Sequence, residues 1–171
     1  GGGTTFWMSP DGTNFNAFRA YTNAPDAGHP RSEVAFAGAT FFTATSSGGT
    51  AGVGAVITGQ TNGSVLLLRS FAAVNADNAT NSGGANPNAV LAHSGALLFG
   101  TTTSGGVAGN GTIYSLTTNG ATLAVLRDFT ALDSPTGTNT DGAQPRGGVV
   151  LSGNTLYGTA AAGGAGGSGV V

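Results

Sequence analysis

Short apolar runs alternate with polar or glycine-rich turns along the whole chain. In one such run, Leu123, Val125 and Arg127 fall on one face of an extended chain. Ala124 and Leu126 fall on the other face, and this period of two is typical of a strand. No segment keeps an apolar period of 3.6 residues long enough for a helix. The pattern therefore predicts an all-β protein.

Three anchors recur in the same order along the sequence. The first is a glycine that opens a short strand and is followed nine places later by a second glycine. The second is a proline at a turn, and the third is an aromatic residue followed six places later by a glycine pair. The opening glycines are Gly3, Gly54 and Gly111, the prolines are Pro30, Pro87 and Pro145, and the aromatics are Phe42, Phe99 and Tyr157. Anchors in register predict tandem repeats.

The prolines lie 57 and then 58 residues apart, which sets the repeat length. We expect repeats over residues 1–53, 54–110 and 111–168, and residues 169–171 as the start of a fourth repeat or an edge strand. The first repeat is shortened between Tyr21 and its proline. Length varies there and almost nowhere else, so we expect an exposed loop that tolerates insertion.

Each repeat is expected to form four short antiparallel strands. In the third repeat these are residues 112–117, 122–129, 148–151 and 155–159, with a hairpin turn at Asn119-Gly120. Four strands in about 57 residues favour β-propeller-type blades, three in this chain, because known blade repeats contain about 40 to 50 residues. A β-solenoid is the alternative, and each repeat would then supply two rungs. A lone four-stranded sheet leaves apolar faces in water, so neighbouring sheets should stack.

Composition narrows the function classes. The chain has 32 glycines and only 7% charged residues, and all five basic residues are arginines. It lacks the basic stripe that nucleic-acid binding requires. It also contains no run of 18 apolar residues, which is the length that a membrane-spanning helix needs. There is no cysteine, which excludes disulfides and thiolate metal sites.

The third repeat resembles a known family, the GloVer (Gloeo/Verruco) tandem repeat of predicted bacterial surface proteins. It reads GTIYSLTTNG, LRDF, DGAQP and GNTLYGT and ends in GSG, and the second repeat keeps GANP, LLFGTTTSGG and GNG. The first repeat departs most, with FFTATSSGG at residues 41–49. The resemblance covers essentially the whole chain. It implies a β-propeller-like fold and an extracellular or cell-surface setting, but it carries no functional residues.

No catalytic or cofactor-binding residue is expected, and we interpret the chain as non-enzymatic. His93 stands where the other repeats have an apolar strand residue, and His29 stands before the turn proline, so both are expected to be structural. The seven acids form no recurring pair of the kind that a hydrolase needs. Arginines that recur before an aromatic or after the turn proline are expected to pair with a neighbouring blade or with a loop carbonyl.

One loop gathers oxygen atoms. Asp133, Asn139 and Asp141 of the third repeat are weak calcium candidates, because calcium takes 6 to 8 oxygen ligands from such loops. The equivalent loops of the other repeats carry fewer acids, which favours a solvated polar loop instead. No other metal site is expected.

The leading hypothesis is a structural or interaction protein of repeated blades outside the cell, self-assembling into oligomers or filaments. Three blades do not close a propeller, which needs about four to eight. Further repeats or another copy of the chain would complete it, and two copies would give six blades. The alternative is a glycan- or ligand-binding propeller whose long loops line one face. An enzyme would need catalytic residues from blades outside this sequence.

Overall fold

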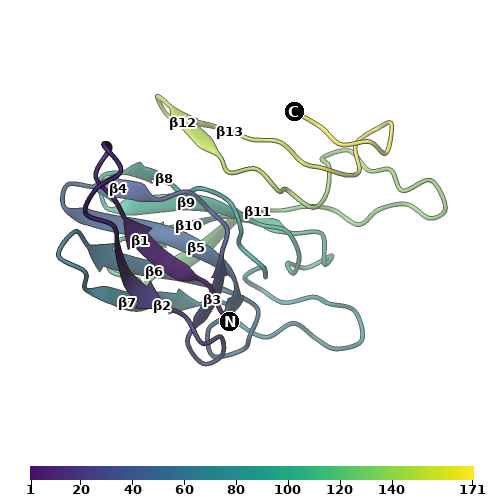
Figure 1. The fold of residues 1–171 in the computed structure, drawn as a ribbon. Helices are drawn as coiled ribbons and strands as arrows, with labels where there is room; N and C mark the ends of the chain where they lie inside the picture. The colour runs from purple at the N-terminus through teal and green to yellow at the C-terminus, as the bar shows by residue number, and fades with distance from the viewer.

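The computed structural model describes residues 1–171, except for the side chain of Phe18. The described chain consists of strands, turns and loops, with no helix, so the predicted all-β class is confirmed (Figure 1). The strands are β1 (Thr4–Trp7), β2 (Asn16–Ala20), β3 (Ala27–Pro30), β4 (Ala35–Ala37), β5 (Thr40–Gly48), β6 (Ala55–Gln60), β7 (Val65–Ser70), β8 (Ala92–Ser94), β9 (Leu97–Thr102), β10 (Thr112–Thr117), β11 (Leu123–Asp128), β12 (Val150–Ser152) and β13 (Thr155–Tyr157).

The third repeat shows how closely the sequence pattern matches the strands. β10 has the bounds predicted for its first strand, and β11, β12 and β13 lie within two residues of the other three predictions. The turn between β10 and β11 is closed by a hydrogen bond from the N–H of Gly120 to the carbonyl of Thr117, 2.8 Å long. Gly120 has a φ of +74°, which a glycine adopts without strain.

The strands group into sheets that cross the repeat boundaries. Strands β3 to β7 form the first central sheet, in which β4 and β3 both pair with β5. The second central sheet has the order β11-β10-β9-β8. The second combines the last two strands of one repeat with the first two of the next, and the first does the same with β3 as an additional strand. The N-terminal hairpin (β1–β2) and the C-terminal hairpin (β12–β13) form two separate two-stranded sheets.

The two central sheets stack face to face around the main hydrophobic core. The core residues are Phe42, Val56, Phe71, Leu91, Leu98, Tyr114 and Leu116. The rings of Phe71 and Tyr114 meet edge to face with centroids 5.2 Å apart. Each large apolar side chain buried in this way contributes roughly 1.5–3 kcal/mol. The stacking that the apolar faces predicted is thus the main source of stability between sheets.

The same succession continues to both ends of the molecule. A smaller cluster of Tyr21, Ala27 and Ile57 joins the N-terminal hairpin side to the first central sheet. At the other end the edge strands lie in a row, because β4 contacts β8 and β8 contacts β12. Figure 1 shows the C-terminal hairpin at one side of the central sheets, with the long loops extending beyond them.

The opening glycine and the turn proline of each repeat lie against each other. A Cβ on Gly54, whose φ is +106°, would lie 2.5 Å from Pro87 Cδ and from the carbonyl oxygen of Thr45. Gly3 and Gly111 meet Pro30 and Pro145 in the same way. The residue before each proline donates its N–H to the residue before the opening glycine, as from Asn86 to Val53 at 2.7 Å. The two anchors recur because together they close each repeat.

Candidate functional site

The two histidines occupy structural positions. His93 lies in β8, and its ring stacks on Phe42 with centroids 6.4 Å apart and an interplanar angle of 16°. His29 has a φ of 51°, close to the 56° and 52° of Asn86 and Gln144 at the equivalent positions. Its Nδ1 lies 2.6 Å from Ser47 Oγ. Both side chains thus contact their own repeat or the neighbouring sheet.

The loop proposed for calcium is held together by its own hydrogen bonds. Asp141 accepts from Arg127 Nε at 3.2 Å and from the Thr130 hydroxyl at 2.6 Å. Partial burial alone would raise the pKa of Asp141, but these two partners lower it below its usual value. Asn139 uses its side-chain oxygen to accept from backbone N–H groups. Calcium binding would have to compete with these contacts, and it stays a prediction.

Among the described residues, no group of three or more His, Cys, Asp or Glu side chains is arranged to hold a metal ion. The described chain also contains no helix long and apolar enough to cross a membrane. Of the acidic residues, Asp11 accepts hydrogen bonds within a turn, and Asp26 and Asp141 form ion pairs.

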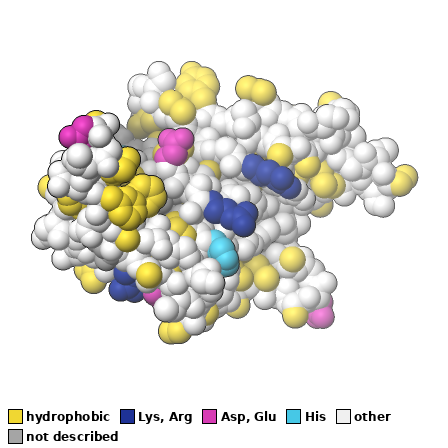
Figure 2. All heavy atoms as spheres, in the orientation of Figure 1, with side chains coloured by type: hydrophobic (Ala, Val, Ile, Leu, Met, Phe, Trp, Pro, Cys, Tyr) yellow, Lys and Arg dark blue, Asp and Glu magenta, His cyan; other side chains and the backbone are white. Residues whose placement is uncertain are grey.

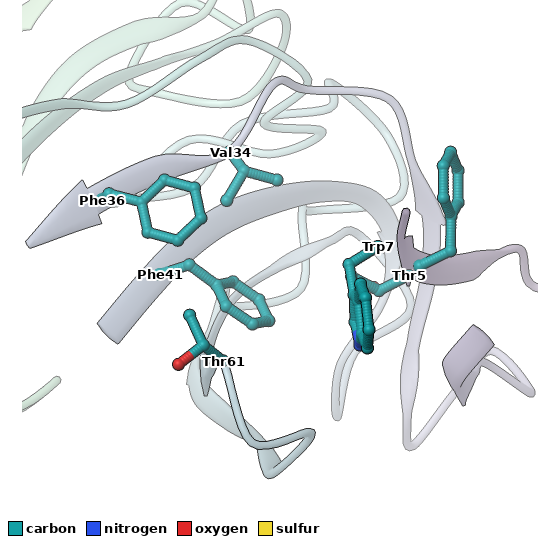
Figure 3. Close-up of a pocket in the computed structure, with 7 residues that line it drawn as sticks. Thr5, Trp7, Val34, Phe36, Phe41 and Thr61 are labelled. Carbon is teal, nitrogen blue, oxygen red and sulfur yellow. The ribbon is translucent and has the colours of Figure 1, made fainter. Parts of the chain in front are cut away.

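One opening lies between the N-terminal hairpin and the first central sheet. This aromatic groove has a volume of about 450 Å³ and is lined by Trp7, Val34, Phe36 and Phe41, with Thr5 and Thr61 as polar neighbours. Figure 3 shows Trp7 on one side of it and Phe36 and Phe41 on the other. Figure 2 shows exposed hydrophobic side chains gathered at this end of the molecule. Trp7 and Phe36 are exposed by 43% and 58%.

The face of the N-terminal hairpin that carries Phe6 and Met8 is also apolar. Phe6 also lines the aromatic groove, and its ring lies against that of Phe15 with centroids 5.4 Å apart. Phe6 and Met8 are exposed by 58% and 51%. Their counterparts in the third repeat, three and five places after the opening glycine, are Tyr114 and Leu116, which are fully buried between the central sheets. This face lacks the neighbouring sheet that covers its counterpart.

A second opening lies under the C-terminal hairpin. This receiving cavity has a volume of about 210 Å³, and its apolar lining includes Ile113, Phe129, Val149 and Leu156. On the outer side of the same hairpin, Tyr157 is 60% exposed and borders a further groove of about 420 Å³. Both ends of the sheet stack therefore present apolar surfaces beside a two-stranded sheet.

Comparison with known proteins places the chain among repeat proteins. The family model of the Gloeobacter/Verrucomicrobia repeat matches residues 1–171. The chain belongs to this family. No curated protein and no solved structure matches it. The family suspected from the sequence is thus confirmed over the whole chain.

Within this Gloeobacter/Verrucomicrobia repeat, an asparagine six places before the turn proline ties two loops together, and sequence reasoning missed it. Asn139 Oδ1 accepts from the N–H groups of Gly142 and Gly164, both at 2.8 Å. Asn81 Oδ1 accepts from Gly84 at 2.7 Å and from Gly106 at 3.0 Å. The recurrence of asparagine at this spacing was the signal that could have revealed it.

The partners of two arginines also differ from those expected from the sequence. Arg19 and Arg127 pair with carboxylates, Asp26 at 2.7 Å and Asp141, instead of with another sheet or a loop carbonyl. Both acids stand four places before the turn proline, where the second repeat has Gly83. Burial would raise the pKa of Asp26, but the Arg19 hydrogen bond leads the contacts that lower it. Each pair links the second strand of its repeat to the loop before the turn proline.

Proposed function

We propose that this chain is a non-enzymatic structural and interaction repeat protein that acts outside the cell and associates with further copies of itself. The observation that carries the proposal is that each end of the sheet stack is a two-stranded sheet with exposed apolar side chains. Exposed apolar surface beside an unpaired strand edge favours association.

In this proposal the four-stranded sheets are β-propeller blades. The row formed by β4, β8 and β12 supports it, because the first strands of successive blades approach one another around a propeller axis. The two central sheets, with the two terminal hairpins counted as half a blade each, amount to three blades, which is fewer than the four to eight of a closed ring. Two copies joined end to end would supply six.

Association is tested by sedimentation equilibrium of the 171-residue chain over a wide concentration range. We expect an average mass that rises with concentration, and filaments or discrete rings in electron micrographs of the concentrated sample. A monomer mass at every concentration would refute self-association. The extracellular setting is tested separately, by protease treatment of intact source cells, which should remove the protein.

Glycan binding is a second candidate, and the aromatic groove favours it. Trp7 and Phe36 offer exposed ring faces, and Thr5 and Thr61 add hydroxyl groups beside them. Saturable binding on a glycan array that is lost in Trp7→Ala would support this function. The matched control is Val107→Ala, whose side chain is 71% exposed and lies outside the groove. Absence of binding across the array would count against it.

A further inference from the structure

We infer that the receiving cavity under the C-terminal hairpin takes the ring of Phe6 from a second copy of this chain, whose β1 pairs with β13. The inference rests on the proposed self-association and names the contact through which it occurs. The partner segment is the N-terminal hairpin, and the resulting sheet has the order β12-β13-β1-β2 with the last two strands from the second copy.

The receiving cavity has the same walls as the place where Tyr114 is buried. Around Tyr114, the core is formed by Val56, Phe71, Leu91 and Leu98. One repeat later, the residues at the same positions are Ile113, Phe129, Val149 and Leu156, and all four line the cavity. Beside the C-terminal hairpin, Val170 occupies the start of the corresponding strand position, where it bridges Ala160 and also lines the cavity.

A glycine stands opposite the ring position both in the second central sheet and in the C-terminal hairpin. Tyr114 pairs with Gly100 of β9, and a Cβ on Gly100 would lie 2.6 Å from the tyrosine Oη, so only glycine leaves room for the ring. The equivalent residue of the C-terminal hairpin is Gly158, which also lines the cavity. In the first central sheet Thr43, which is larger than glycine, stands at the position of Gly100. Ile57, which is smaller than tyrosine, stands at the position of Tyr114.

Phe6 is the residue of this chain that matches the cavity. It stands three places after its opening glycine, as Tyr114 does, and it is 58% exposed. Its strand β1 has a partner on one edge only, β2, so its other edge is open to pairing. Neither β1 nor β13 carries a charged side chain. Arg19 of β2 and Asp141 at the cavity are each already ion-paired within their own repeat.

The central sheets also give the register. Because Ser115 pairs with Phe99 and Tyr114 with Gly100, Trp7 of the second copy should pair with Tyr157 and Phe6 with Gly158. Thr4 of the second copy would then take the place of Val170, which now exchanges two backbone hydrogen bonds of 3.0 and 3.1 Å with Ala160. Those two hydrogen bonds are replaced by equivalent ones.

The outer side of the C-terminal hairpin fits the aromatic groove of the same second copy. Tyr157 corresponds to Phe42, and Phe36 corresponds to His93. Phe42 and His93 stack between the central sheets, whereas Tyr157 and Phe36 are exposed by 60% and 58%. End-to-end pairing of two copies would bring these two rings together. One contact therefore covers both openings.

The test compares sedimentation equilibrium of four purified chains: the parent, Phe6→Ala, Gly158→Val and Val107→Ala. Phe6→Ala removes the inserted ring, and we expect it to weaken association at least ~10-fold, as for a central contact residue. Gly158→Val fills the cavity from the other side and should weaken association to a similar degree. A Cβ at Gly158 would lie 3.1 Å from the movable Val149 Cγ1 and 3.6 Å from the Gly148 carbonyl oxygen, an ordinary contact, so the fold should tolerate it.

Val107→Ala removes a comparable apolar side chain from a loop and should leave association unchanged. Urea unfolding of each variant verifies that all four are folded. A chain that associates equally well with Phe6→Ala and Gly158→Val would overturn the inference and leave the proposed function standing. A parent chain that stays monomeric would overturn both. Removal of residues 169–171, which frees Ala160, should tighten association, and weaker association would contradict the register.

Discussion

Replacing Tyr114 with phenylalanine probes the packing between the central sheets with a single atom. Tyr114 is fully buried, and its hydroxyl oxygen has no hydrogen-bond partner among the described residues. Burial without a partner also raises the pKa of the Tyr114 phenol above its usual range. A buried polar group left unsatisfied costs about 1–3 kcal/mol, and an apolar replacement of the same shape removes that cost.

We expect Tyr114→Phe to raise the free energy of unfolding by about 1 kcal/mol, because the small space left by the hydroxyl offsets part of the gain. For a chain of this length that corresponds to about 2–4 °C in melting temperature. Urea unfolding and calorimetry measure both quantities. Tyr114→Ala, which empties the site, should instead cost about 3–5 kcal/mol.

Tyr157→Phe is the matched control, because Tyr157 is 60% exposed and the same change should leave stability within about 0.5 kcal/mol. The comparison is made at a concentration where the chain is monomeric. A loss of 1 kcal/mol or more in Tyr114→Phe would show that the hydroxyl is satisfied in the folded protein, and would refute the argument.

Three further changes test the repeat itself. Gly54→Ala should lower the free energy of unfolding, measured with urea, by more than about 2 kcal/mol, because Gly54 has a positive φ and an added Cβ would overlap the backbone. Gly137 also has a positive φ but has open space around it, so Gly137→Ala should cost only about 1 kcal/mol. Asn139→Ala should cost about 2–3 kcal/mol and speed amide exchange in its two loops, and exchange as slow as in the parent would contradict the loop contacts. Asp26 and Asp141 have lowered folded pKa values, so their contribution is present above the unfolded pKa of about 3.9 and is lost as pH falls through the folded values. Asp141→Asn should reduce the loss in free energy of unfolding below about pH 4 by about 0.5–1 kcal/mol, as measured by urea unfolding at each pH. An unchanged acid profile would contradict this ion pair.

The sequence predicted the strands well because their signals are local. The alternation in residues 122–129 and the Asn119-Gly120 turn depend on neighbouring residues only, and β10 and β11 lie where those signals place them. The grouping of strands into sheets was not predictable in the same way. A tandem repeat has no intrinsic starting point, so its period is equally consistent with sheets inside one repeat or across two.

The lengths of the loops distinguish strands that pair from strands that lie in different sheets. β9 ends at Thr102 and β10 begins at Thr112, while β7 and β8 are separated by residues 71–91. The shorter connection joins strands that pair, and the longer one crosses from sheet to sheet. With the sheets placed, the exposure of Phe6 follows, because its hairpin is a separate two-stranded sheet. From sequence alone Phe6 was one apolar strand residue among many.

The candidate loop residues show a similar limit. Asp141 and Asn139 were noticed for their oxygens, but the partners that occupy those oxygens come from β11 and from the Gly163-Gly164 connection, which are distant in sequence. The arginine recurs in all three repeats, but the acid that pairs with it occurs in the first and third repeats only. The ion pair could therefore be recognised only by comparing those two repeats.

Thiol cross-linking tests the central claim most directly, because the chain has no cysteine of its own. Phe36→Cys and Tyr157→Cys are prepared separately, mixed and treated with a short bifunctional thiol reagent. The double variant Phe42→Cys with His93→Cys is the positive control, since those rings stack within one chain at 6.4 Å. We predict dimers in the mixture and almost none from either single variant alone. Equal cross-linking in the single variants, or none in the mixture while the control reacts, would contradict end-to-end completion of the sheets.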